Sequence, residues 1–174
     1  SKLRYYAVSK RPASAIGQVW RVETREYDPK LGVGDQLHFD LRANPVVTRS
    51  GDEKSKRHDV VMQAKKHLLN ARGLARWQDW QGDDKPALYD LVHEEGSKWL
   101  AARSERLGFR AIEECLTVDA YTQHGGKKGT LKFSTVDFSG VLAVTDVDLF
   151  TRALFDGIGP AKAFGCGLLL VRRA

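Results

Sequence analysis

The chain has 174 residues, 42% apolar and 29% charged, and its 28 lysines and arginines against 22 aspartates and glutamates give a formal net charge of +6. A chain of this size can bury a core without a disulfide framework or a structural metal, and the composition excludes a mainly disordered protein. The two cysteines lack C-x-x-C spacing, and no apolar run is long enough to cross a membrane. We therefore expect a cytoplasmic protein without metal or cofactor, whose positive charge favours an anionic partner.

The N-terminal part of the chain has a strand-like pattern. Apolar and polar residues alternate over 4–8 and 18–24, which predicts two strands of a small sheet. A stretch rich in glycine and proline follows over 28–34. We place a domain boundary there, between residues 1–34 and a second domain over residues 35–174.

The second domain is expected to open with a strand over residues 36–44, because apolar and polar residues alternate until Pro45 interrupts the pattern. Residues 49–58 carry no apolar side chain, which predicts a mobile loop. Residues 60–69 fit either a strand or a helix.

The remaining pattern predicts a helix, two strands, a helix and a strand. Apolar residues at helical spacing mark the longest helix over 86–107, and a glycine-rich turn joins strands over 109–122 and 130–144. A short helix starts at residues 145–148, and a last strand covers 167–171. From residue 36 onward this is the βαββαβ order of the ferredoxin-like α+β fold.

A glycine-rich segment over residues 157–167 is the strongest local indication of function. Gly157, Gly159, Gly165 and Gly167 let a backbone approach phosphates closely, and Lys162 can neutralise one. The segment follows a helix and precedes a strand, the reverse of both nucleotide-binding glycine motifs. The composition of the segment is also explained if it only ends the helix and connects it to the last strand, without binding a ligand.

Other basic residues are candidates for contacts with the phosphates of an anionic partner. Lys127 and Lys128 lie at the tip of the predicted hairpin, and Lys132 lies on its returning strand. A two-stranded hairpin is narrow enough to enter a deep groove and contact phosphates there. The further candidates are Arg42 on the first strand and the polar-loop residues Arg49, Lys54, Lys56 and Arg57. All of them could instead be solvated, and Arg42 could pair with Asp40 or Glu23.

The histidines do not identify a catalytic centre. General acid–base catalysis needs a base and an acid close together, and no pair of histidines has a spacing that predicts such a pair or a metal site. The five are His38, His58, His67, His93 and His124. The catalytic residues therefore stay unassigned.

Two segments resemble a known family. Residues 157–169, GIGPAKAFGCGLL, are similar to the C-terminal glycine-rich signature of the CasE-type CRISPR repeat-RNA endoribonucleases, the crRNA-processing subunits of subtype I-E Cascade. Residues 37–45, LHFDLRANP, resemble a second motif of that family, in matching order. The resemblance extends over nearly the whole chain.

The resemblance implies a pair of ferredoxin-like domains of the RAMP superfamily, complete over residues 35–174 and represented by closing strands over 1–34. It implies metal-independent cleavage of pre-crRNA repeats at the base of the stem-loop, with the 3′ hairpin kept bound. The implied partners are the repeat stem-loop and other Cascade subunits, especially the backbone subunit, with no membrane. The family's catalytic histidine lies on a helix ahead of Arg4, so we expect these residues to lack it.

Two other functions are compatible with the same fold. One is a non-catalytic RNA-binding module such as an RRM, although residues 131–136 lack the aromatic motif of that domain. The other is a small-molecule regulatory or oligomerisation domain, which a packed and dry glycine-rich segment would favour. Fold alone does not choose among these functions.

Overall fold

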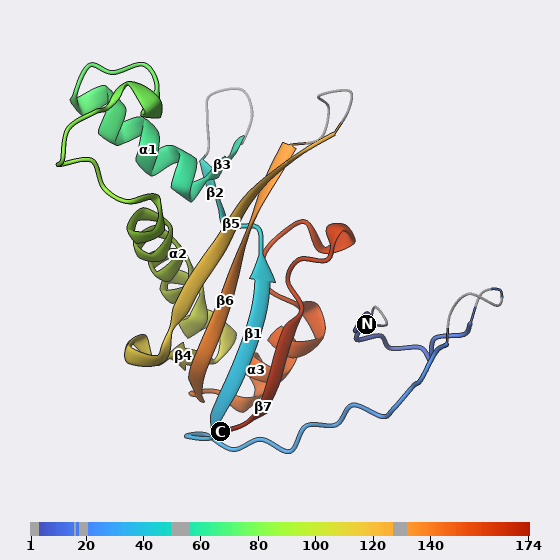
Figure 1. The fold of residues 1–174 in the computed structure, drawn as a ribbon. Coiled ribbons are helices and arrows are strands. Elements are labelled where there is room, and N and C mark those ends of the chain that lie inside the picture. Colours follow the sequence, from blue (N-terminus) through green and yellow to red (C-terminus); the bar gives the residue numbers. More distant parts are fainter. Residues whose placement is uncertain (1–3, 16, 18–20, 50–55, 127–131) are drawn as a thin grey trace.

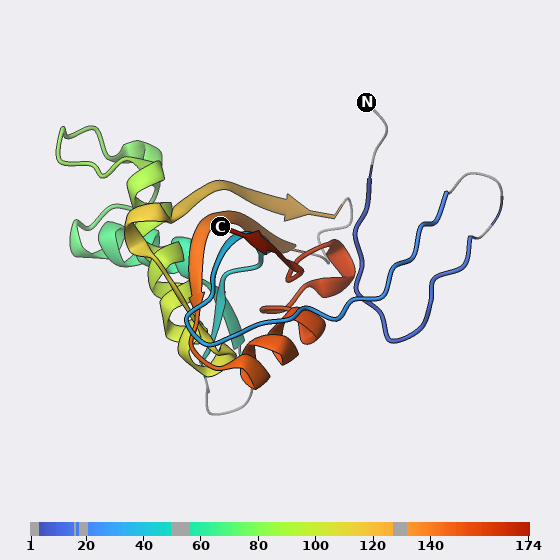
Figure 2. The same cartoon turned by 90° about the horizontal axis from the view of Figure 1, so that it is seen from below.

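The computed structural model describes residues 4–15, 17, 21–49, 56–126 and 132–174. One antiparallel sheet forms its centre, and the longer helices lie on one of the two faces of that sheet (Figures 1 and 2). The strands of this sheet are β1 (Gln36–Ala43), β4 (Phe109–Ala111), β5 (Thr117–Gly125), β6 (Lys132–Val144) and β7 (Leu169–Arg173). Their order is β4-β6-β1-β7, with β5 also pairing with β6.

This topology confirms the ferredoxin-like prediction. Helices α1 (Val60–Ala71) and α2 (Leu88–Ser104) follow β1, and α3 (Val147–Asp156) connects β6 to β7. Strands β4 and β5 both pair with β6 and together take the place of the second strand of the βαββαβ unit. Short 3₁₀ turns complete the fold: η1 (Trp77–Asp79), η2 (Glu105–Leu107), η3 (Glu113–Cys115) and η4 (Lys162–Phe164).

Local signals explain where the helices begin and end. The carboxylate of Asp59 accepts a hydrogen bond from the Met62 N–H at 2.8 Å, which caps α1 and shows that residues 60–69 are helical. Asp146 caps α3 in the same way through the Leu149 N–H. Gly108, in the left-handed conformation, ends the turn that follows α2, as the sequence predicts.

The core lies between the helices and the sheet. Side chains from alternate positions of β1 and β6, including Phe39 and Phe138, are almost completely buried there. They meet Trp99 and Leu100 of α2 and Phe150 of α3, and the Trp99 ring stacks on Phe138 with centroids 5.8 Å apart. This packing leaves the other face of the sheet open.

The prediction of two N-terminal strands is wrong for the described part of that segment. Residues 4–8 and 21–24 contain no strand, and the Tyr5 and Tyr6 side chains are 72% and 64% exposed. An isolated two-stranded hairpin is marginally stable, and here its alternating pattern has no layer to pack against. The division into domains at residue 34 stays a prediction.

Two further predictions need correction. Thr48 and Arg57 pair across a two-stranded ladder of β2 (Val46–Arg49) and β3 (Lys56–Asp59), so a loop is wrong for the ends of 49–58. The strand predicted over 109–122 is divided by η3. Its Cys115 carbonyl packs so close to Gly140 of β6 that a Cβ on residue 140 would overlap it.

Among the described residues, no helix is long and apolar enough to cross a membrane.

Candidate nucleic-acid interface

The glycine-rich segment forms a tight loop between α3 and β7. Gly157, Gly159, Gly165 and Gly167 have φ angles of 72°, 81°, 79° and 91°, all of which favour glycine. Ala161 adds a fifth positive φ of 63°. The chain therefore reverses direction repeatedly within a few residues, which only this glycine content permits at low cost.

The base of this loop is packed against its own backbone. The Ile158 N–H donates to the Gly167 carbonyl at 2.7 Å, and the Gly167 N–H donates to the Arg42 carbonyl at the end of β1, also at 2.7 Å. A Cβ on Gly157 would lie 2.7 Å from the Gly167 oxygen, and one on Gly159 would lie 3.3 Å from the Trp99 ring. At these positions glycine serves the fold itself.

The tip of the loop is different, because it faces open space. A Cβ on Gly165 would meet no atom within 4 Å. Lys162 is exposed, and the Phe164 side chain is 52% exposed. Residues 162–165 are therefore the part of the segment that a ligand can approach, and a loop packed throughout is excluded.

An aromatic cluster joins this tip to the β5–β6 hairpin. The Phe133 ring stacks on His124 with centroids 4.6 Å apart and contacts Phe164 at 5.1 Å. A His124 ring nitrogen also lies 3.0 Å from the Thr135 hydroxyl. Phe133 alternates with buried residues of β6, so the cluster lies on the open face of the sheet.

The structure places the sequence-predicted basic residues unevenly. Lys132 is exposed at the start of β6, beside the aromatic cluster. Lys54, Lys127 and Lys128 lie outside the described residues. Lys56 and Arg57 are exposed on β3, and Arg57 lines a pocket beside residues 157–160 of the glycine-rich loop. Contacts of all these residues with RNA stay predictions.

Arg42 forms a bidentate ion pair with Asp137, and both nitrogen–oxygen distances are 2.6 Å. This partner is neither Asp40 nor Glu23, because Asp137 lies directly opposite Arg42 on the neighbouring strand. The hydrogen bonds and charge of Asp137 raise the pKa of the Arg42 guanidinium. The side chain is still 58% exposed, so one edge faces solvent.

The histidines remain without an assigned catalytic role. One ring nitrogen of His93 lies 3.3 Å from the Leu116 carbonyl, and His124 is held by Thr135 and Phe133. Within the described ranges, no group of three or more histidine, cysteine, aspartate or glutamate side chains is placed to hold a metal ion.

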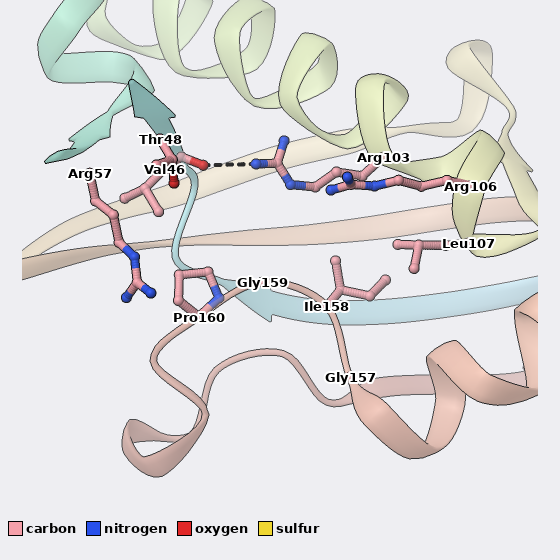
Figure 3. Close-up of a pocket in the computed structure, with 10 residues that line it drawn as sticks. All are labelled: Val46, Thr48, Arg57, Arg103, Arg106, Leu107, Gly157, Ile158, Gly159 and Pro160. Atoms are coloured by element: carbon pink, nitrogen blue, oxygen red, sulfur yellow. Dashed lines mark hydrogen bonds between the residues drawn. The ribbon is translucent and has the colours of Figure 1, made fainter. Parts of the chain in front are cut away.

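A pocket of about 390 Å³ lies on the helix side of the glycine-rich loop (Figure 3). Its walls are β2, β3, the end of α2 with η2, and residues 157–160. Figure 3 shows Arg103 and Arg106 extending toward β2, while Arg57 extends from β3 toward Pro160. Arg103 and Arg106 were not predicted from the sequence as site residues, although their i, i+3 spacing places them on one side of the chain.

Arg103 is held rigidly in this pocket. Its two terminal nitrogens donate to the Val46 carbonyl at 2.8 Å and to the Trp99 carbonyl at 3.1 Å. Its guanidinium also lies 4.2 Å from the centroid of the Trp99 ring. Burial, and to a smaller extent the charge of Arg106, lower the pKa of Arg103.

Comparison with known proteins identifies relatives of this chain. A family described as "CRISPR associated protein" matches residues 1–173. The Escherichia coli K12 protein "CRISPR system Cascade subunit CasE" is 32% identical over 153 residues, which cover 85% of this chain and 63% of that protein. The chain therefore spans less than two thirds of the length of this relative.

Solved structures show the same arrangement of elements. Thermus thermophilus Cse3, bound to an RNA representing a pre-cleavage complex, matches with a TM-score of 0.57 and 26% identity over 84% of this chain and 57% of that chain. The Escherichia coli CRISPR-associated protein Cas6e matches with a TM-score of 0.53 and 24% identity over 88% of this chain and 68% of that chain, which supports the fold alone. The predicted RAMP-type ferredoxin-like fold is thus confirmed.

Proposed function

Because the chain belongs to this CRISPR-associated family, we propose that it is part of a CasE-type crRNA-processing endoribonuclease. The protein would cleave pre-crRNA repeats at the base of their stem-loop and keep the 3′ hairpin bound as a Cascade subunit. The 32% identity to the Escherichia coli Cascade subunit supports this proposal at the level of the family. We further propose that its partners are other Cascade subunits, especially the backbone subunit, and that it acts in the cytoplasm.

The observation that carries the proposal is the exposed tip of the glycine-rich loop. Its lysine, its exposed aromatic ring and its unobstructed glycine are grouped within residues 162–165, next to Phe133 near the turn of the β5–β6 hairpin. Lysine neutralises phosphate, and aromatic rings stack on bases of single-stranded RNA. Thermus thermophilus Cse3, which shares the fold, is bound to RNA.

The proposal assigns RNA recognition, rather than cleavage, to the described residues. We infer that the loop tip and Lys132 contact the RNA near the cut, while the hairpin with Lys127 and Lys128 contacts the stem. Cleavage is proposed to need no metal, with a histidine as the base that activates the 2′-hydroxyl. We propose that this histidine lies ahead of Arg4, as the resemblance implies.

Fluorescence anisotropy with a labelled repeat hairpin tests recognition. The 174-residue chain is expected to bind this hairpin more tightly than a scrambled RNA of the same length, which is unable to form the stem. Charge reversal of the tip by Lys162→Glu should weaken binding, whereas Lys66→Glu, an exposed position on α1, should leave it unchanged. Equal affinity for the two RNAs would contradict the proposed function.

A further inference from the structure

The pocket on the helix side of the glycine-rich loop gathers three positive charges from separate elements. Arg57 comes from β3, Arg103 from α2 and Arg106 from η2 (Figure 3). None of the described residues that line the pocket is acidic. Within the described part of the chain, none of the three arginines forms an ion pair, although other arginines, such as Arg42 and Arg76, do.

The position of Arg103 is unfavourable without an anion. The positive charge of Arg106 repels that of Arg103, and the partial burial of Arg103 weakens the screening by water. Arg103 is also unable to move away from Arg106, because it is bound to two carbonyls and stacked on Trp99. The preorganised guanidinium of Arg103 therefore offers its charge, at little entropic cost, to a ligand that carries negative charge, beside the exposed charges of Arg57 and Arg106.

The rest of the lining indicates what kind of anion fits. Leu107, Ile158 and Pro160 provide apolar surface beside the charges, and Thr48 provides a hydroxyl. A volume of about 390 Å³ exceeds what an isolated ion needs and lies within the range of small-molecule sites. A phosphate with its attached nucleoside combines charge and apolar surface in this way, and the forked guanidinium matches phosphate oxygens.

We propose that this pocket binds one backbone phosphate and an adjoining nucleoside of a single-stranded part of the RNA. This inference rests on the proposed function, which supplies RNA as the ligand. The pocket is lined by residues 157–160, and the exposed tip covers residues 162–165 of the same loop. A strand that contacts the tip can therefore continue around the loop into the pocket, which makes RNA a better candidate than an acidic protein segment.

The first test compares arginine variants in RNA binding. Arg57→Gln and Arg106→Gln remove one exposed charge each, and Arg152→Gln on α3 is the matched control outside the pocket. For a hairpin with an unpaired extension, each pocket variant should weaken binding about tenfold, as expected for a charge-assisted hydrogen bond. The double variant should lower the slope of log affinity against log salt by about 0.7, the value for one single-strand phosphate.

The second test does not depend on the repeat hairpin. The Nε–H signal of Arg103 is followed by NMR while tetrauridylate or a tetraglutamate peptide is added to the chain. A shift with tetrauridylate that is lost in the Arg57→Gln/Arg106→Gln double variant supports the pocket as a nucleotide site. A shift with the peptide alone, or with neither probe, overturns the inference in favour of a protein partner or a structural cluster.

The two tests separate this inference from the proposed function. If the chain binds the repeat hairpin and the double variant binds it with the same affinity and salt slope, the pocket inference is wrong and the function stands. If the chain does not distinguish the hairpin from a scrambled RNA, but tetrauridylate still shifts Arg103, the function is wrong and the pocket stands. Circular dichroism melting of each variant verifies the fold.

Discussion

Substitutions of two glycines in the same loop should have opposite consequences for folding and for binding. Gly157 has φ 72° and ψ 167°, a region that is essentially restricted to glycine, and its occupation by alanine costs about 1–3 kcal/mol. The new Cβ would also lie 2.7 Å from the Gly167 carbonyl, which accepts the Ile158 hydrogen bond. Losing that bond adds about 1 kcal/mol. Gly157→Ala should thus destabilise the protein by about 2–4 kcal/mol.

Gly165 differs because a Cβ at this position would meet no atom within 4 Å, and only its left-handed φ of 79° opposes a side chain. Gly165→Ala should therefore cost only about 1 kcal/mol. Gly165→Asn should cost less, since asparagine occupies this conformation more readily than alanine. The added amide would nevertheless stand between the backbone and an approaching phosphate, so RNA affinity should fall about tenfold.

Urea unfolding and thermal melting measure the first effect, and fluorescence anisotropy with a repeat hairpin measures the second. For a chain of this length, Gly157→Ala should lower the melting temperature by about 5–15 °C and Gly165→Asn by no more than about 4 °C. The reasoning is refuted if Gly165→Asn destabilises the protein as much as Gly157→Ala. It is equally refuted if Gly165→Asn folds normally and binds RNA with undiminished affinity.

Three further predictions concern RNA binding, cleavage and pH. Affinity for the repeat hairpin should fall steeply with salt, by about 0.7–0.9 in the log–log slope for each phosphate contacted, and a flat dependence would contradict lysine–phosphate contacts. Gel analysis of labelled repeat RNA should show that these 174 residues bind the RNA without cutting it. A CasE-type protein that includes the family's histidine helix should cut the RNA equally well with and without EDTA. Specific cutting by the 174 residues would instead show that one of their own histidines is catalytic. Burial, followed by the charge and hydrogen bond of Asp59, raises the pKa of Tyr121, so its stabilising effect is present below the unfolded pKa of about 10 and is lost as pH rises above it. Tyr121→Phe should cost about 1 kcal/mol at neutral pH and reduce the loss of stability in alkaline urea titrations, whereas an unchanged alkaline loss would exclude Tyr121 as its source.

Much of the fold follows from patterns that are local in the sequence. The strict alternation over Gln36–Ala43 reports one buried face of a strand, and it needs no knowledge of the partner strands. Helical spacing and a terminal glycine likewise define α2 and its end at Gly108. The same kind of alternation misled over residues 4–8 and 21–24, because a strand also needs a neighbour to accept its hydrogen bonds and a layer to cover its apolar side.

The candidate site was only partly predictable, because the role of each residue depends on neighbours that are distant in the sequence. The glycine-rich segment is conspicuous in the sequence. Its amino-acid sequence does not, however, distinguish Gly157, which packs against Gly167, from Gly165, which faces open space. Sequence alone allowed several partners for Arg42, and strand register selected Asp137.

The arginine pocket shows most clearly what tertiary structure decides. Arg57, Arg103 and Arg106 lie in different elements, and in the sequence each is one basic residue among 28 lysines and arginines. Local sequence determines which residues face the core, because burying one face of a strand or helix requires apolar residues at a regular spacing along the chain. The convergence of charged side chains depends instead on how distant elements pack, and packing is set by contacts among many residues at once.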